Sequence, residues 1–428
     1  SGGSSRDLAA LRHYSESHQS GRQIMRLDFA HDHFCRRDAL RLGAAGAAAV
    51  AAGSILSVEA AGAAPPGPPP DGGPYTDDIF DAEAVAEGGV WMSPYGAADQ
   101  RGTLNEVTPE RTRDALKTLT RGSPVNTYQL GEEMFNGFPA FPSSPPRLHE
   151  MALLVFGYNA GQAFVDGGGI QDLDFPFGPN LVVGHEERFA ENFTFQIGSQ
   201  VDGLNHVGIA ASGRGGRFYN DNFATDFITP TGTTALGNES MGPIATRGVI
   251  VDVVGLKVAT GATADYFMAP NGHAVLNDSY RITIDDIENS LHRQRIHKPI
   301  GPGDVPILHT GWTHILRNDP GRYLSQEPGI YLAEARYLID RRVSIVATDT
   351  WGLEVLDPSV TSGNAFPCHQ ELLGRTGVRI GESFVTDAAI ADDAYEGVLV
   401  VTPENVPGAT AGSSAPAFLA QPGQSPRS

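Results

Sequence analysis

The chain has 428 residues, a formal net charge of −20 and a pI of about 5.0. An acidic chain is a poor ligand for nucleic acid or an anionic membrane, so we expect it to bind neither. The 51 glycines and 30 prolines indicate many turns and loops and argue against a helical bundle. The two cysteines, Cys35 and Cys368, are too few for a cysteine-rich zinc motif.

Residues 1–63 have the pattern of an export leader. Arg36 and Arg37 are adjacent, and an apolar run rich in alanine and glycine extends from Leu42 to Leu56. The tripeptide that ends at Ala63 then matches the small-x-small pattern of a cleavage site. This combination is typical of a twin-arginine signal, so we expect a periplasmic or secreted protein. The alternative is a disordered, alanine-rich leader.

The rest of the chain divides into a linker, one folded domain and a tail. Residues 64–74 are rich in proline and glycine and have little capacity to pack, which indicates a linker. Residues 75–417 are expected to form the domain that carries the function. Residues 418–428 are expected to be a loose tail.

The first part of the domain combines a clear helix start with a long loop-rich segment. Thr108 is a good N-cap and Pro109 suits the first helical position, which predicts a helix to about Leu119. Residues 131–190 contain many prolines and three phenylalanines: Phe135, Phe138 and Phe141. This segment is either a lid that offers aromatic surface to a substrate or an ordinary surface insertion.

A short alternating pattern follows this segment. Phe193, Phe195 and Ile197 alternate with polar residues, which predicts a half-buried strand. Gly198 then permits a tight bend or a close backbone approach.

Metal-binding residue types gather around this predicted strand. In an extended chain, Gln196, Gln200 and Asp202 share parity and point to one face, and His206 follows after a glycine-containing bend. Amide oxygens, a carboxylate and an imidazole on one face suit a metal-assisted site. The alternative is a polar turn that satisfies its own backbone.

Further along the chain, apolar runs typical of buried strands alternate with helices. Buried strands are predicted within Thr246–Val254, Val305–Trp312 and Val343–Thr350. Helices are predicted at Thr283–Gln294, where Thr283 is the N-cap, and at Glu327–Arg341. Strands that alternate with helices indicate an α/β fold.

The stretch from Gln196 to His206 resembles the signature H-x-G-T-H-x-D-x-P-x-H of a metal-dependent hydrolase family that includes kynurenine formamidase, isatin hydrolase and the cyclases. Here it reads Q-x-G-S-Q-x-D-x-L-x-H. Three of its residues match: Gly198, Asp202 and His206. Gln196 and Gln200 stand where the family has histidine ligands, and Leu204 stands where it has proline. Related long-chain members also carry glutamine at the second position, which points to a subgroup.

The resemblance extends to both ends of the domain. Trp91–Asn105 is similar to the family's W-G-x-x-D-x-x-G-x-L-N segment, and Tyr219-Asn220 to a Y-N-G segment near the pocket. It implies that Trp91, Tyr219 and Asn220 contact the substrate. Alternatively, the polar residues of the first segment only form turns.

The resemblance also implies a set of metal ligands. The family's histidine before a Leu-Leu pair and its glutamate after the next turn correspond to His369 and Glu382, which join Asp202. Two carboxylates that converge without a cation would repel, and a divalent metal resolves this. Gln196 and Gln200 offer only carbonyl oxygens, which shifts the expectation from two zinc ions to one ion, Mn²⁺ or weakly bound Zn²⁺.

The implied fold is a kynurenine formamidase-like (swivelling β/β/α) single domain with a mixed sheet and a loop-rich insertion. The implied function is an exported metal-dependent hydrolase that opens an amide, lactam or lactone of a small cyclic or aromatic substrate, with His206 relaying protons. Family members are expected to form homodimers or homotetramers. Two alternatives remain open: a binding protein or degenerate enzyme on the same scaffold, and a metal-free cyclase or lyase that uses His206 as general base.

Overall fold

The computed structural model describes residues 75–87, 91–155, 179–180 and 184–423. Every described residue belongs to one compact unit, Gly62–Ser428. The predicted leader and linker lie outside the described residues.

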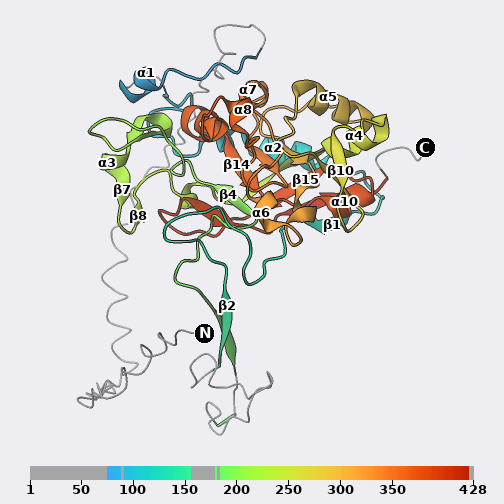
Figure 1. The fold of residues 1–428 in the computed structure, drawn as a ribbon, viewed down its shortest axis with the longest axis horizontal. Helices are drawn as coiled ribbons and strands as arrows, with labels where there is room; N and C mark the ends of the chain where they lie inside the picture. The colour runs from blue at the N-terminus through green and yellow to red at the C-terminus, as the bar shows by residue number, and fades with distance from the viewer. Residues whose placement is uncertain (1–74, 88–90, 156–178, 181–183, 424–428) are drawn as a thin grey trace, which may run out of the picture. The chain divides into compact units, whose positions relative to one another are not determined.

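One nine-stranded sheet forms the centre of the domain (Figure 1). From edge to edge its strands are β1 (Asn126–Gln129), β17 (Ala417–Ala420), β15 (Glu396–Val401), β9 (Ile244–Asp252), β12 (Val305–His309), β13 (Ile345–Thr348), β14 (Arg379–Glu382), β4 (Gln200–Asp202) and β16 (Ala411–Ser413). The four neighbours from β9 to β14 run parallel, and the outer pairs are antiparallel.

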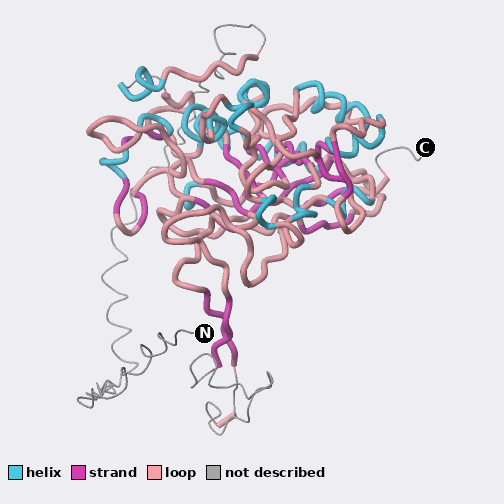
Figure 2. Tube along the Cα trace, in the orientation of Figure 1, coloured by secondary structure: helices cyan, strands magenta, loops and turns pink. Residues whose placement is uncertain are grey.

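Helices and loops surround this sheet, as Figure 2 shows by colour. The α-helices are α1 (Ala82–Glu87), α2 (Pro109–Leu116), α3 (Ala224–Phe227), α4 (Val253–Thr260), α5 (Ile284–Arg293), α6 (Pro320–Tyr323), α7 (Leu332–Asp340), α8 (Pro358–Thr361), α9 (Pro367–His369) and α10 (Asp387–Ala391). Shorter 3-10 helices are η1 (Gly102–Glu106), η2 (Tyr219–Asp221), η3 (Asn238–Ser240) and η4 (Trp312–Ile315), and η5 (Gln370–Thr376) is a π-helix. The mixed sheet within a single α/β domain confirms the predicted fold class.

Apolar side chains cover both faces of the parallel strands, because helices and loops pack on both sides. Along β9, Val249 and Val251 join a buried cluster that includes residues of α4, α5 and α7. Ile250, between them, joins a second buried cluster on the other face, with residues of η1 and α10. This alternation is the period of two expected for a strand.

The predicted helix starts agree with the structure. The Thr108 side chain accepts a hydrogen bond from the backbone N–H of Arg111 and caps α2. Thr283 and Asp286 form a capping box at the start of α5. The next predicted helix begins later than expected, at Leu332, because Gly329 and Ile330 form bridges to other segments instead.

Three other boundaries differ from the sequence prediction. Phe193–Ile197 is not a strand, because the Phe193 ring packs against Phe189 and Phe195, with centroids 4.9 and 5.8 Å apart, and β4 begins only at Gln200. Asp252 ends β9 two residues early, since its side chain accepts the Gly255 N–H at 2.9 Å and caps α4. The predicted tail is wrong at its start, because residues 417–420 form β17 inside the sheet.

In the part of the chain that the structure describes, four two-stranded sheets lie outside the large sheet. They pair β2 (Met151–Val155) with β3 (His185–Phe189), β5 (Arg217–Phe218) with β6 (Asn222–Phe223), β7 (Ile228–Thr229) with β8 (Gly232–Thr233), and β10 (Tyr266–Met268) with β11 (Ala274–Leu276). The β2–β3 hairpin belongs to the loop-rich insertion and projects away from the sheet (Figure 1).

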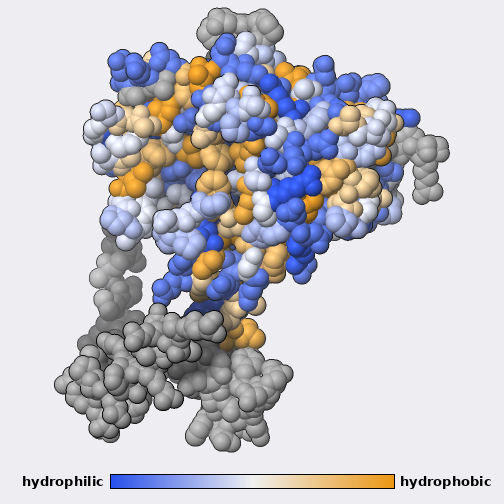
Figure 3. Space-filling model, in the orientation of Figure 1, coloured by the Kyte–Doolittle hydropathy of each residue, from blue (hydrophilic) through white to orange (hydrophobic). Residues whose placement is uncertain are grey.

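The surface of the domain is mixed in hydropathy. On the face viewed in Figure 3, hydrophilic and hydrophobic residues are interspersed. Among the described residues, no helix is long and apolar enough to cross a membrane.

Candidate active site

The register of β4 against β14 brings polar side chains together. The two strands are antiparallel, with Gln200 directly opposite Glu382. Residues in this position lie on the same face of a sheet, and Asp202, two residues further along β4, shares that face. Gln200 Nε2 accordingly donates a hydrogen bond to Glu382 Oε2 at 2.6 Å.

His369 reaches this group from the junction of α9 and the π-helix η5. π-Helical turns are rare and occur frequently at functional sites. Glu354 Oε1 lies 2.6 Å from His369 Nδ1, and the Glu354 carboxylate also accepts the backbone N–H groups of Cys368 and His369. A carboxylate bonded to the far ring nitrogen fixes the imidazole and is typical of metal-ligating histidines.

The structure thus brings together Asp202, His369 and Glu382, whose ligand atoms lie within 4.8 Å of one another. His369 Nε2 is 3.3 Å from Glu382 Oε1 and 3.8 Å from Asp202 Oδ2. The Asp202 side chain is fully buried, and neither of its carboxylate oxygens has a hydrogen-bond partner. Since burying an unpaired carboxylate is costly, the site demands positive charge beside Asp202.

The buried charges shift one another's pKa values. Burial, together with the nearby Asp202 carboxylate, raises the pKa of Glu382 to about 7. Burial alone would lower the pKa of His369, but its hydrogen bonds with Glu354 and Glu382 raise that pKa well above the usual value. Both shifts reduce the net negative charge at this point, since Glu382 is favoured as the neutral acid and His369 as the imidazolium; a bound cation would offset the negative charge instead.

A further carboxyl group, Glu327, contributes to this electrostatic environment. It is fully buried and accepts the backbone N–H groups of Trp351 and Gly352 at 3.0 and 3.2 Å. Burial, with a smaller contribution from Glu382, raises its pKa well above the usual value. This shift favours the neutral form of Glu327, which adds no further negative charge.

The two glutamines of the signature lie at the same site. Gln200 Nε2 donates to Gln196 Oε1 at 2.9 Å as well as to Glu382, while Gln200 Oε1 is buried without a partner. The amide of Gln200 can therefore hold Glu382 with its nitrogen and still offer its oxygen to a cation. Gln196 is half-buried at the cavity wall.

A divalent metal fits this donor set. Asp202 and Glu382 supply carboxylate oxygens, His369 supplies an imidazole nitrogen with the orienting carboxylate of Glu354, and Gln200 has a free carbonyl oxygen. Mixed oxygen and nitrogen donors of this kind suit Mn²⁺ or Zn²⁺.

His206 lies beside these residues, after a turn closed by the hydrogen bond from its N–H to the Gly203 carbonyl at 3.1 Å. Its ring centroid is 6.3 Å from that of His369, and its side chain lines the adjoining cavity. Burial lowers the pKa of His206, although the Asp202 carboxylate partly opposes this. A neutral imidazole that faces a cavity can accept a proton.

The cavity has a volume of about 180 Å³, and aromatic side chains form part of its wall. Besides the polar residues already named, Phe138, Phe141, Trp351 and Phe366 line it. Phe141 packs against Trp351 and Phe366, with ring centroids 5.2 and 5.8 Å apart. Phe138 and Phe141 of the loop-rich segment thus line the cavity, and the role of this segment as a lid over a substrate stays a prediction.

Arg147 brings a permanent positive charge to the same wall. Its Nη1 lies 3.5 Å from the Gln196 carbonyl, and its guanidinium is 5.7 Å from the centre of the Phe141 ring. Arg147 comes from the loop-rich insertion, where no sequence pattern marks it.

Trp91, Tyr219 and Asn220 do not line this cavity. Trp91 is buried against Gly374 of η5, where an added Cβ would lie only 2.5 Å from the indole ring. The Tyr219 hydroxyl is 2.8 Å from both Ser93 Oγ and Asp99 Oδ2. Their predicted role as substrate contacts does not agree with this placement, because all three are engaged in packing or hydrogen bonding elsewhere.

Asn220 shows what this segment does instead. Its Oδ1 accepts the Ser93 N–H at 3.0 Å, and its Nδ2 donates to the Gly96 carbonyl at 3.1 Å. Asp99 accepts the backbone N–H groups of Arg101 and Gly102. The alternative prediction, that polar residues in this segment form turns, describes the structure better.

Sequence reasoning did not identify Glu354, Glu327 or Arg147. Glu354 follows the third predicted strand and reaches His369 only through the fold, so its neighbours in sequence carry no signal. Glu327 precedes a predicted helix, where an acidic residue is explained by its favourable interaction with the helix dipole. Its position therefore gave no reason to assign it to the site.

Comparisons with known proteins identify the family of the chain. The Cyclase family model, described as "Putative cyclase", matches residues 128–355, which is more than half of the chain. No curated protein sequence matches the chain. The structure of a novel cyclase is similar, with 24% identity and a TM-score of 0.58 over 80% of this chain and 99% of that one.

Two further solved structures are similar at a lower level. Isatin hydrolase A from Ralstonia solanacearum has 15% identity and a TM-score of 0.43 over 69% of this chain and 92% of that one. A structure described as a predicted metal-dependent hydrolase from Bacillus stearothermophilus has 17% identity and a TM-score of 0.38 over 69% and 99%. On the family match, and as its signature residues predict, this chain belongs to the cyclase family.

Proposed function

We propose that the protein is a metal-dependent hydrolase that opens an amide, lactam or lactone bond of a small cyclic or aromatic substrate. One observation carries the proposal: the fully buried Asp202 has two carboxylate oxygens without a hydrogen-bond partner beside His369 and Glu382, and these two residues line a cavity whose wall also contains four aromatic side chains. Such an arrangement favours a bound cation, and the cavity gives a substrate access to it. Membership of the cyclase family supports the same conclusion.

Asp202, His369 and Glu382 would hold the ion, with the Gln200 carbonyl oxygen as a fourth candidate donor. A bound Mn²⁺ or Zn²⁺ supplies an activated water at neutral pH and polarises a carbonyl group. Glu354 keeps the His369 ring fixed throughout, because it holds Nδ1 at 2.6 Å.

His206 is the proposed proton carrier. With its pKa lowered by burial, the ring is neutral at pH 7 and takes a proton from the attacking water. Attack forms a new C–O bond at the carbonyl carbon, and the C–N or C–O bond of the substrate then breaks. The proton passes from His206 to the departing nitrogen or oxygen, which regenerates the neutral imidazole.

The cavity wall indicates the substrate class. Phe138, Phe141, Trp351 and Phe366 present flat apolar surfaces, which suit a planar or ring-containing substrate. Opening a lactam or lactone leaves a carboxylate, and Arg147 offers that product a guanidinium partner. We therefore favour cyclic aromatic lactams and aryl amides over linear aliphatic esters.

A hydrolysis screen tests the proposal directly. Aryl formamides, isatin-like lactams and lactones are incubated with protein that has been stripped of metal and then supplied with Mn²⁺ or Zn²⁺. We expect ring opening or amide cleavage only in the supplied samples, and a fall of roughly 10²- to 10⁴-fold for His206→Ala. His297→Ala, at an exposed residue of the α5–β12 connection, is the matched control and keeps full activity.

One observation favours a metal-free alternative. The raised pKa of His369, caused chiefly by Glu354 and Glu382 against the opposing effect of burial, allows an imidazolium to neutralise the site without any ion. In that case the protein is a binding protein, or a cyclase or lyase that uses His206 as its base. Unchanged activity or ligand binding after exhaustive chelation, with no metal recovered by elemental analysis, would select this alternative.

We also propose that the chain is exported by the twin-arginine pathway, on the basis of its leader sequence. Replacing Arg36 and Arg37 together by lysine should retain the protein in the cytoplasm of a host with this pathway. Fractionation of cells that express the original and the replaced chain measures the effect.

A further inference from the structure

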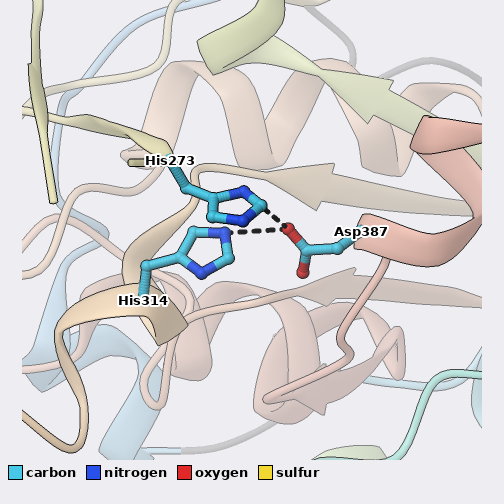
Figure 4. Close-up of side chains that lie close together, drawn as sticks. All are labelled: His273, His314 and Asp387. Atoms are coloured by element: carbon cyan, nitrogen blue, oxygen red, sulfur yellow. Dashed lines mark hydrogen bonds and ion pairs between the residues drawn. The ribbon is translucent and has the colours of Figure 1, made fainter. Parts of the chain in front are cut away.

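A second cluster of metal-binding side chains lies outside the active site. It consists of His273, His314 and Asp387, whose ligand atoms lie within 4.8 Å of one another (Figure 4). His273 lies in the turn between β10 and β11, His314 in η4, and Asp387 is the first residue of α10. Three separate parts of the fold therefore converge on one point.

Figure 4 shows one carboxylate oxygen facing both rings. Asp387 Oδ1 is 2.8 Å from His314 Nε2 and 4.0 Å from His273 Nδ1. The two imidazoles are stacked, with centroids 4.0 Å apart and planes inclined by 23°. Two nitrogens and one oxygen thus already surround a small volume.

The distances are close to those that an ion requires. Zn–N bonds of about 2.0–2.1 Å and Zn–O bonds of about 2.0–2.2 Å place the donors of a tetrahedral site roughly 3.3 Å apart. The observed separations from Asp387 Oδ1, 2.8 and 4.0 Å, lie on either side of that value. His273 is 55% exposed, so its ring can make the small movement needed without disturbing the core.

The surroundings supply further polar groups. Asn271 Nδ2 lies 3.2 Å from His314 Nδ1, the ring nitrogen that does not face Asp387. Asn271, His314 and Asp387 also line a cavity of about 240 Å³ together with Glu132. Arg317 lies on the same wall but pairs with Glu133 at 3.5 Å.

We propose that His273, His314 and Asp387 form a second metal site, for a divalent transition ion such as Zn²⁺, separate from the active site. Two imidazoles and one carboxylate are donors that Zn²⁺ accepts readily. The cavity leaves room for water or for Glu132 as a further ligand. Because the ligands come from a hairpin, a 3-10 helix and α10, a bound ion joins three surface segments.

The test separates this site from the active site. Every protein carries Asp202→Asn, which removes one ligand from the buried centre. Zn²⁺ binding to the full chain is then measured by calorimetry and by elemental analysis after desalting. Co²⁺, used in place of Zn²⁺, reports nitrogen and oxygen ligands through its visible absorption. Histidines of the leader are present in every sample and do not affect the comparison.

We expect the parent to bind one Zn²⁺ that the added His273→Ala substitution weakens by at least roughly tenfold. Asp387→Asn, which preserves the size of the side chain, should have the same effect, whereas His297→Ala should have none. The Co²⁺ spectrum should lose the corresponding band. Near-ultraviolet circular dichroism shows whether each variant keeps its fold.

Zn²⁺ binding that is equal in the parent and in both site variants would overturn the proposal. So would a parent with no Zn²⁺ beyond that bound by the leader. Loss of binding in His297→Ala to the same extent as in His273→Ala would show a general effect of surface histidines and would also overturn it.

Discussion

The two clusters of histidine and carboxylate differ most in what surrounds them. In the active site, Asp202, His369 and Glu382 are all buried, and Glu354 holds the histidine from behind. In the second cluster, His273 is exposed and Asp387 already has an imidazole partner. Water compensates charge more fully at the partly exposed second cluster than at the buried first one. We therefore expect similar ligands to serve catalysis in the first cluster and stability in the second.

The largest expected difference comes from the two aspartates. Asp202→Asn should lower hydrolytic activity by about 10³-fold or more, because it removes a ligand and half of the local negative charge that holds the ion. Asp387→Asn should leave activity unchanged. Steady-state kinetics on the best substrate of the screen measures the activity of both variants. Equal losses of activity in the two variants would contradict the different roles proposed for the two clusters.

A substitution of Glu354 tests whether His369 needs the hydrogen bond with this carboxylate to bind the metal. Glu354→Gln removes the charge that faces His369 Nδ1 and should reduce metal affinity or activity by roughly 10- to 100-fold. Glu110→Gln, at an exposed position in the first turn of α2, is the matched control. Metal titration followed by activity assay measures the effect, and a wild-type response from Glu354→Gln would mean that the backbone alone positions His369.

The stability of metal-free protein should fall as pH rises from 6 to 8. The pKa values of Glu382, about 7, and of His369 are both raised in the fold, so the folded state binds more protons than the unfolded state. The stabilisation from such groups is fully present below their pKa values in the unfolded chain and is lost as pH rises through their pKa values in the folded protein. We expect the free energy of unfolding to fall by on the order of 2 kcal/mol. Denaturant unfolding measures it, and added Mn²⁺ or Zn²⁺ should reverse the trend, since the ion competes with protons.

The smallest expected effect concerns the outer cluster. With saturating Zn²⁺, His273→Ala should lower the melting temperature by a few degrees relative to the unsubstituted chain, on the scale of about 1–3 kcal/mol of lost ligand binding. Without Zn²⁺ the two proteins should have the same melting temperature. Differential scanning calorimetry measures the two melting temperatures. A difference between them that persists in the presence of a chelator would mean that the His273 ring stabilises the protein by packing.

The general architecture could be predicted from the sequence because its signals are local. Apolar runs mark β9, β12 and β13, and Thr108 and Thr283 mark helix starts. The strand predicted at Phe193–Ile197 failed because aromatic side chains that alternate along a chain can pack on one another instead of on a sheet.

The candidate site was predictable only in part, and mainly through resemblance. Parity places Gln200 and Asp202 on one face, but only the family's motif connects them with His369 and Glu382. Glu354 and Arg147 could not be found, since their roles depend on the tertiary fold. Trp91, Tyr219 and Asn220 show the opposite error, because residues of a shared motif can serve packing rather than substrate contact.

The position of β17 has a consequence for the order of assembly. This strand is the last of the nine to be synthesised, yet it lies between β1 and β15, and β1 has no other partner in the sheet. The strand β1, which is synthesised first, can therefore join the sheet only after β17 has been synthesised. This side of the sheet forms only when nearly all of the domain has left the ribosome. A chain that ends before Ala417 lacks β17, so β15 becomes an exposed edge of the sheet. Such a chain should be prone to aggregation through this edge.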